Sequence, residues 1–385
     1  MTKINRPILA HPPGSPEFDP TYFLFERYAG RAAGQSRLLS MYYSIKPLIP
    51  RPIQLEIRRI FARRQAQRAF PAWPIEPILV EHEYGRLQRT LRDSGEESVP
   101  LVNFWPEAKR FSVIVTHDVE GSTGVENIPR VLEVERRHGI VSAWNFVAET
   151  YRIPSGLFDT IREAGCEIGL HGVTHDGKLF RDRSHFEADL PKIHSYLDEW
   201  GAVGFRSPAT HRNADWMAEL GCLYDGSFPD TDPFEPQAGG CCSILPFFIG
   251  GLVELPITLV QDHTLFEILG ETSISLWTQK SEWIMQHHGL VHLLVHPDYL
   301  LTADRLAAYE QILEFLSGRT DCWHALPMEV ARWWHARAGM RCGPMSGGRA
   351  EIEGGPHYGG TVAYAREEAG RIVIDVDELA ASGLG

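Results

Sequence analysis

The sequence predicts an α/β protein built on an incomplete (β/α) barrel of about seven strands. Apolar segments of strand length alternate with segments of helical periodicity between about residues 110 and 338, and such alternation is typical of parallel strands joined by helices. Glycine follows most of the helical segments, as expected at helix C-termini. A doubly wound open sheet is the alternative, but the glycine pattern of a dinucleotide-binding fold is missing after the first strand.

The predicted elements divide the chain into three parts. Strands are predicted at 111–115, 141–148, 168–170, 204–208, 223–228, 252–258 and 290–297. Helices are predicted at 125–138, 155–164, 185–200, 213–220, 281–288, 302–316 and 327–338. We therefore expect a helical and irregular extension at 1–105, a barrel domain at 106–339, and a Gly-rich tail at 340–385. Within this tail, residues 361–365 and 371–376 alternate like the strands of a β-hairpin.

The N-terminal extension contains one basic segment, predicted as a helix over residues 54–68. Its arginines are Arg58, Arg59, Arg63, Arg64 and Arg68. Because its apolar face is narrow, packing against the main domain is favoured, and contact with an anionic membrane surface is the alternative. Residues 71–105 are predicted as a Pro- and Trp-containing connection to the barrel.

Composition excludes several classes of protein. The formal net charge is -13 and the sequence pI is about 5.7, which argues against a general nucleic-acid binder. No run approaches the ~18 apolar residues of a membrane span, and the first residues lack the apolar segment of a signal peptide. None of the six cysteines forms a C-x-x-C pair. A cytoplasmic location with reduced thiols is therefore expected.

Polar residues collect at the ends of the predicted strands. They are Asp118, Glu120, His171, His175, Arg206, Asp225 and His296. In a barrel the C-terminal strand ends meet on one face, where catalytic groups gather. Two neutral histidines and a carboxylate suit a divalent ion with open positions. A second carboxylate can accept a proton from water, and a separate histidine can donate one to a leaving group.

At these positions the chain resembles the NodB-homology polysaccharide deacetylases, carbohydrate esterase family four. The motifs occur in the family's order over roughly residues 110–335. The segment His171-Gly-Val-Thr-His175 resembles the family's His-[Ser/Thr]-x-x-His metal motif, with Gly172 in place of Ser or Thr. Residues 205–208, with Trp216 downstream, resemble the family's third motif. Residues 224–227 resemble the fourth motif, and residues 294–297 resemble the fifth.

The first motif departs from the family's pattern. Most members have two adjacent aspartates, whereas here the run is Asp118-Val119-Glu120, similar to an Asp-x-Asp or Asp-x-Glu branch. In an extended strand both carboxylates point to the same side. We expect Asp118 to be the base and Glu120 a metal ligand; the longer Glu120 side chain leaves the reverse assignment open.

The resemblance implies roles for the other residues. His171 and His175 would be metal ligands, His296 the general acid, and Arg206 the residue that orients the base. Asp225 would either tune His296 or hold the turn after its own strand. Contacts with substrate would come from Trp216, Ser207 and Pro208.

The implied activity is metal-dependent hydrolysis of an N-acetyl group, or an O-acetyl group, on an amino sugar or polysaccharide. The expected cofactor is Zn²⁺, with Co²⁺ or Ni²⁺ as alternatives, and the expected partner is a carbohydrate. Two other functions are alternatives: hydrolysis of a C–N amide bond in a small non-carbohydrate substrate, and sugar binding without catalysis. A closed pocket rather than a broad aromatic groove would favour the small substrate, and saccharide binding without release of acetate would favour the non-catalytic function.

Overall fold

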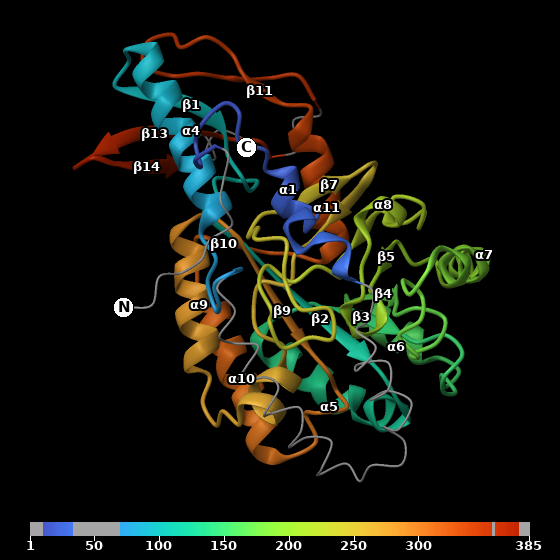
Figure 1. Ribbon diagram of the computed structural model, residues 1–385. Helices are drawn as coiled ribbons and strands as arrows, with labels where there is room; N and C mark the ends of the chain where they lie inside the picture. The colour runs from blue at the N-terminus through green and yellow to red at the C-terminus, as the bar shows by residue number, and fades with distance from the viewer. Residues whose placement is uncertain (1–10, 34–69, 356–358, 377–385) are drawn as a thin grey trace.

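The computed structural model describes residues 11–33, 70–355 and 359–376, and its centre is a curled parallel sheet surrounded by helices (Figure 1). The predicted basic helix at 54–68 lies outside the described residues. The central sheet has nine strands. They are β2 (Phe111–Val119), β3 (Ala143–Phe146), β4 (Glu167–Leu170), β5 (Gly204–Phe205), β6 (Tyr224–Asp225), β7 (Phe247–Ile249), β8 (Leu252–Glu254), β9 (Leu290–Val295) and β10 (Cys322–His324).

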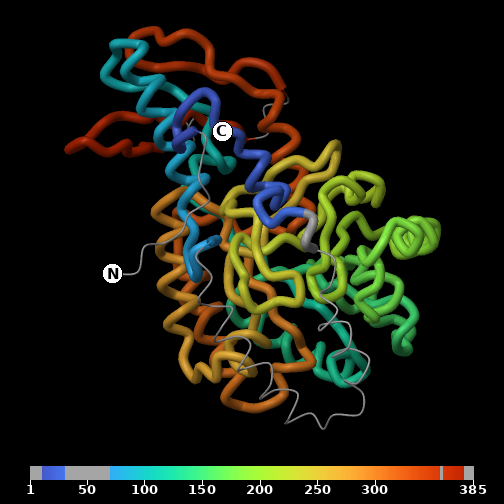
Figure 2. The backbone as a smooth tube through the Cα atoms, viewed as in Figure 1, coloured from blue at the N-terminus to red at the C-terminus, as the bar shows by residue number. Residues whose placement is uncertain are grey.

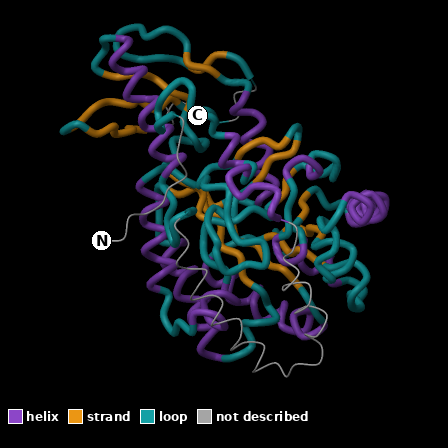
Figure 3. Tube along the Cα trace, in the orientation of Figure 1, coloured by secondary structure: helices purple, strands orange, loops and turns teal. Residues whose placement is uncertain are grey.

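Helices connect these strands and cover the outside of the sheet, as the purple segments of Figure 3 show. They are α5 (Ser122–His138), α6 (Leu157–Glu163), α7 (Arg183–Trp200), η3 (Pro208–Thr210), α8 (Ala214–Met217), the π-helix η4 (His263–Leu269), α9 (Ser275–Gln286), α10 (Ala303–Ser317) and α11 (Pro327–Ala338). Local sequence sets several boundaries. Asp182 caps α7 by accepting a bond from the His185 amide, and Gly139 ends α5 in the left-handed conformation.

The strand order confirms the predicted incomplete barrel. The sheet runs β10-β2-β3-β4-β5-β6-β8-β7, and β9 pairs with β2 as well. All pairs are parallel except the β7–β8 hairpin. Each of the seven predicted strands overlaps a strand of the structure. Strands β7 and β10 are additional, and the predicted helix at 281–288 begins earlier, as α9.

The segment after β8 contacts β9 through a few specific bonds rather than a regular ladder. The Leu259 amide donates to the His292 carbonyl at 3.1 Å. The Thr258 hydroxyl donates to the Leu290 carbonyl at 2.7 Å and accepts from the His292 amide at 2.8 Å. One side chain thus satisfies two backbone groups that a full strand pair would satisfy.

Strand β2 lies at the centre of this arrangement. All nine of its residues are buried, as expected for a parallel strand covered on both faces. The C-terminal ends of the parallel strands come together at one end of the sheet (Figure 1). The residues at and just after these ends therefore share a common face.

A smaller unit packs beside the barrel. Strand β1 (Ser98–Val102) pairs with β13 (Val362–Glu368), which pairs with β14 (Arg371–Val376), and α4 (Ile78–Ser94) packs on this sheet. Figure 2 shows the early residues in blue to cyan and the last residues in red lying together at one end of the molecule. Strands β11 (Arg341–Cys342) and β12 (Ile352–Glu353) form a further pair.

Strands β13 and β14 form a hairpin over the residues where one is predicted, and the connection at 71–105 contributes β1 to the same sheet. The connection contains a helix and a strand because a helical apolar pattern follows Pro77, with Ile78, Leu87 and Leu91 buried. The partner of β1 comes about 260 residues later in the chain, as for Val102 opposite Val362. Local sequence patterns do not reveal a pairing at that separation.

Residues 11–33 fold onto the segments that follow β5 and β6. They contain α1 (Thr21–Leu24) and η1 (Arg27–Ala33). The buried guanidinium of Arg212 donates through Nε to Glu26 Oε2 at 2.7 Å, and the Tyr28 hydroxyl donates to the Gly240 carbonyl at 2.6 Å. Across the described ranges, the structure has no helix with the length and apolar character needed to cross a membrane.

Candidate active site

Three side chains from the ends of β2 and β4 form a potential metal site. One ligand atom each from Glu120, His171 and His175 lies within 4.8 Å of the others. Glu120 follows directly after β2, and His171 follows directly after β4. His175 lies four residues further on, where Nε2 approaches Glu120 Oε1 at 3.0 Å.

His171 has the protonation state that a metal ligand requires. Its Nδ1 donates to the Arg206 carbonyl at 3.1 Å, so Nε2 has a free lone pair. That Nε2 is buried without a hydrogen-bond partner. Burial lowers the pKa of His171 to about 4, despite the nearby Asp118 carboxylate, so the ring is neutral at physiological pH.

At His171 burial determines the direction of the pKa shift, whereas in the Glu120–His175 pair the attraction between the two side chains outweighs burial. Burial alone would raise the pKa of Glu120, but its bond with His175 and the nearby His296 lower it. Burial opposes a charge on His175, yet Glu120 raises its pKa. A cation at this point would take the place of the His175 proton, as metal binding to histidine usually requires. The set therefore fits a divalent ion, since one carboxylate and two imidazoles are common zinc ligands.

Asp118 lies beside this set and is almost fully buried. Asn145 of β3 donates to Asp118 Oδ1 at 2.9 Å, and Oδ2 lies 3.8 Å from both His171 Nε2 and Arg206 Nη1. Burial would raise the pKa of this carboxyl, but the neighbouring His171, Arg206 and His296 side chains bring it below its ordinary value. Asp118 is thus kept ionised next to the cluster.

His292 positions Arg206 by accepting a hydrogen bond from its guanidinium group. The His292 Nδ1 donates to the carbonyls of Leu255 and Pro256 at 3.1 and 3.0 Å, so Nε2 accepts from Arg206 Nη2 at 3.2 Å. Thr116 Oγ1 also accepts from Nη2, at 3.1 Å. Burial and the adjacent Arg206 lower the pKa of His292 to about 3, which keeps the ring neutral and able to accept.

The carboxylate that contacts His296 comes from Asp262. Asp262 Oδ1 accepts from His296 Nδ1 at 2.7 Å, and Oδ2 accepts from the His296 amide at 2.9 Å. The His296 Nε2 faces Glu120 Oε1 at 3.9 Å. Although burial disfavours the charge, Asp262 and then the site carboxylates raise the pKa of His296 to about 10. The imidazolium form is therefore the stable one at neutral pH.

The comparisons with known proteins relate this barrel to solved structures. No protein-family model matches the chain, and no curated protein matches it. A structure from Mycobacterium smegmatis, described as a candidate polysaccharide deacetylase, superposes with a TM-score of 0.50 at 20% identity, covering 61% of this chain and 93% of that one. This chain has the fold of a polysaccharide deacetylase. The fold predicted from the motif order is thereby confirmed.

Two further structures were found at lower similarity. The PuuE allantoinase has a TM-score of 0.47 at 16% identity over 60% of this chain and 92% of its own. A Pseudomonas aeruginosa PAO1 structure, described as a probable polysaccharide deacetylase, has a TM-score of 0.47 at 16% identity over 60% of this chain and 93% of its own.

Within this deacetylase fold, Gly172 has a structural reason to replace the usual Ser or Thr. Its φ is +70°, and a Cβ there would lie 2.8 Å from Cδ and Cγ of Pro208. Pro208 begins η3, directly after the segment that positions Arg206. The two loops at the metal site therefore pack through backbone at Gly172, which leaves no room for a side chain.

We expect the Gly172→Ser variant to be destabilised by about 1–3 kcal/mol, because the left-handed backbone and the contact with Pro208 both oppose a side chain. Gly139→Ser is the matched control, since Gly139 has φ +64° and a Cβ added there would have no atom within 4 Å. Chemical denaturation of both variants separates the effect of the backbone from that of the contact. Equal losses of unfolding free energy in the two variants would show that Pro208 plays no part.

Asp225 and Trp216 have neighbours other than those their predicted roles imply. The Asp225 carboxylate accepts from the Ser227 hydroxyl and amide at 2.8 and 2.9 Å. Burial and the adjacent Asp225 raise the pKa of Glu254 well above its ordinary value, so this pair retains a proton. These contacts favour the alternative in which Asp225 holds its turn. The half-buried Trp216 packs on Phe186, with ring centroids 5.8 Å apart.

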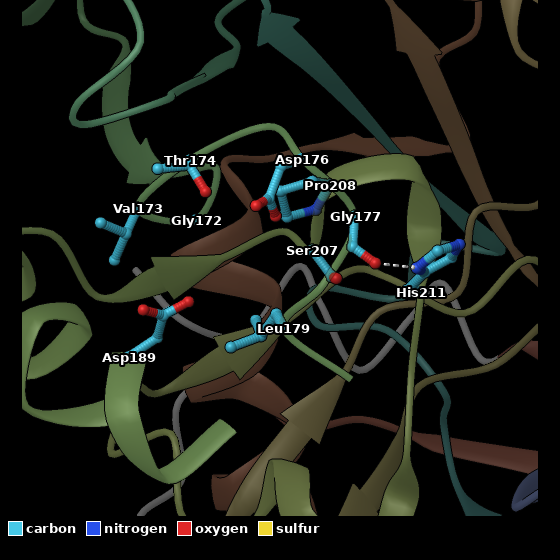
Figure 4. Close-up of a pocket in the computed structure, with 10 residues that line it drawn as sticks. All are labelled: Gly172, Val173, Thr174, Asp176, Gly177, Leu179, Asp189, Ser207, Pro208 and His211. Carbon is cyan, nitrogen blue, oxygen red and sulfur yellow. Dashed lines mark hydrogen bonds between the residues drawn. The ribbon is translucent and has the colours of Figure 1, made fainter. Parts of the chain in front are cut away.

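Ser207 and Pro208 line a pocket beside the metal-site loop (Figure 4). Its lining residues are Gly172, Val173, Thr174, Asp176, Gly177, Leu179, Asp189, Ser207, Pro208 and His211. Asp189 and His211 lie at opposite ends of the pocket in this view, and His211 Nδ1 donates to the Gly177 carbonyl at 3.0 Å. The Ser207 hydroxyl is buried without a partner. Both residues are buried, and their contact with substrate stays a prediction.

Proposed function

We propose that the chain is a metal-dependent deacetylase of the NodB-homology family, hydrolysing the N-acetyl group of an amino sugar or polysaccharide. The observation that supports this is the metal-ligand cluster of Glu120, His171 and His175, placed between an ionised carboxylate and a protonated histidine. Zinc is the ion we propose, because the ligand set matches its preference for imidazole and carboxylate.

Glu120, His171 and His175 would hold the ion through Oε1 and the two Nε2 atoms. A bound divalent ion supplies Lewis acidity that makes a water molecule more acidic and polarises the acetyl oxygen. The remaining chemistry falls to side chains of the chain itself, and each has a suitable protonation state.

Asp118 is the proposed general base. Its carboxylate is ionised, Asn145 fixes one oxygen, and Arg206 stabilises the negative charge. It accepts a proton from the attacking water as the new C–O bond forms at the acetyl carbon. Arg206 in turn is kept in place by His292 and Thr116.

His296 is the proposed general acid. Asp262 holds Nδ1, so Nε2 is the atom that faces the site. Its proton passes to the sugar nitrogen as the C–N bond breaks, which gives acetate and a free amine. In this proposal Asp118 therefore accepts a proton from the attacking water, whereas His296 donates one to the leaving nitrogen.

The test is release of acetate from N-acetylglucosamine oligomers by zinc-loaded protein, with a small cyclic amide as a second substrate. We expect acetate release that is lost on chelation and restored by zinc. Hydrolysis of the cyclic amide alone would favour the small-substrate alternative. Full activity after exhaustive removal of metal would contradict the proposal.

A further inference from the structure

The segment that follows His296 turns back toward Glu120. The Tyr299 amide donates to the His296 carbonyl at 2.9 Å, which closes a tight turn over Pro297 and Asp298. The Asp298 Oδ2 accepts from the Glu120 amide at 3.0 Å, and the Tyr299 hydroxyl donates to Glu120 Oε2 at 3.4 Å. One turn thus contacts both the backbone and the side chain of Glu120.

Asp298 also provides the cap that α5 lacks. Gly121, at the N-terminal boundary of α5, has no side chain to cap the helix. Asp298 Oδ1 accepts from the Gly124 amide at 3.1 Å, which satisfies an amide of the first turn. A Cβ on Gly124 would lie 2.1 Å from Asp298 Oδ2, so glycine is needed for this approach. Asp298 therefore ties the Glu120 backbone to the start of α5.

Tyr299 is itself held on several sides. Arg305 Nη1 donates to the Tyr299 carbonyl at 3.3 Å. The Tyr299 ring lies 5.3 Å from the His296 ring and 5.0 Å from the His263 ring, measured between centroids. Because its ring is fixed, the hydroxyl approaches only one oxygen of Glu120, and the other oxygen faces His175.

We infer that Tyr299 and Asp298 are positioning residues that let a glutamate act as the carboxylate ligand of the metal site. The inference rests on the proposed function of Glu120. A glutamate has one more rotatable bond than an aspartate, and ordering it costs more conformational entropy. Asp298 fixes the backbone end of this side chain, and Tyr299 fixes one carboxylate oxygen, so that Oε1 alone is directed to the cluster.

The experiment measures the zinc affinity of metal-free protein by competition with a chromophoric chelator. The Tyr299→Phe variant keeps the ring and loses only the hydroxyl. Loss of a partner that orients a ligand typically weakens metal binding 10–100-fold, and we expect about tenfold for this long bond. Tyr196→Phe is the control, since its hydroxyl donates to the carboxylate of Glu149 at 3.3 Å, on a different part of the barrel.

A double-mutant cycle with Glu120→Asp distinguishes positioning from a general effect on the fold. The shorter aspartate does not reach the Tyr299 hydroxyl, so Tyr299→Phe is expected to cause no further loss of zinc affinity in that background. Equal losses in both backgrounds, or an unchanged affinity in Tyr299→Phe, would overturn the inference. Zinc binding by His171→Ala that equals the wild type would instead overturn the proposed metal site.

Discussion

Asp118→Asn is expected to lower kcat on the order of 100- to 10,000-fold, the range in which a general base typically contributes. The amide cannot accept the water proton. The variant should still bind zinc, because Glu120, His171 and His175 are unchanged. The measurements are acetate release and zinc content of the same preparation.

This variant also tests the reverse assignment, in which Asp118 is a ligand and Glu120 the base. Loss of zinc together with activity would favour that assignment. Activity within threefold of wild type, with zinc bound, would remove Asp118 from the mechanism altogether.

His296→Ala is expected to lower kcat by a similar factor of roughly 100 to 10,000, since the leaving amine would depart without a proton. The measurement is acetate release.

In the wild type, activity should fall on the basic side of the pH profile, as His296 loses its proton. Asp262 raises the pKa of His296, so Asp262→Asn should move this basic limb to lower pH.

Asp225→Asn is the matched control, because Asp225 is an equally buried aspartate whose carboxylate contacts Ser227 rather than His296. It should leave the basic limb in place. A shift of the limb in Asp225→Asn, without one in Asp262→Asn, would reverse the roles given to the two aspartates. The pH profile is the necessary readout, since either substitution can affect stability.

Much of the barrel follows from local pattern. Each predicted strand is a short apolar run with a glycine-terminated helix before or after it, and this pattern places Asp118, His171 and Arg206 at strand ends. The positions of Glu120 and His175 follow from the same strands by counting residues. These side chains meet in the structure because parallel strands bring their C-terminal ends to one edge.

The residues that sequence reasoning missed depend on irregular or distant segments. Asp262 follows β8 by eight residues, in the stretch leading into a π-helix, and no periodic pattern marks it. Its place after a strand end was a usable signal, but nothing local pairs it with His296, 34 residues later. The role of Tyr299 likewise depends on how the turn after β9 packs against the end of β2, which the sequence pattern does not encode.

The most direct test of the proposed metal centre is elemental analysis of the purified protein beside its His171→Ala and His175→Ala variants. We expect about one divalent ion per chain in the wild type, and its loss in both variants, because each removes one of the three proposed ligands. Absence of metal from the wild type under zinc-replete conditions would contradict the central claim. Retention of a full equivalent by both variants would place the ion elsewhere and contradict it equally.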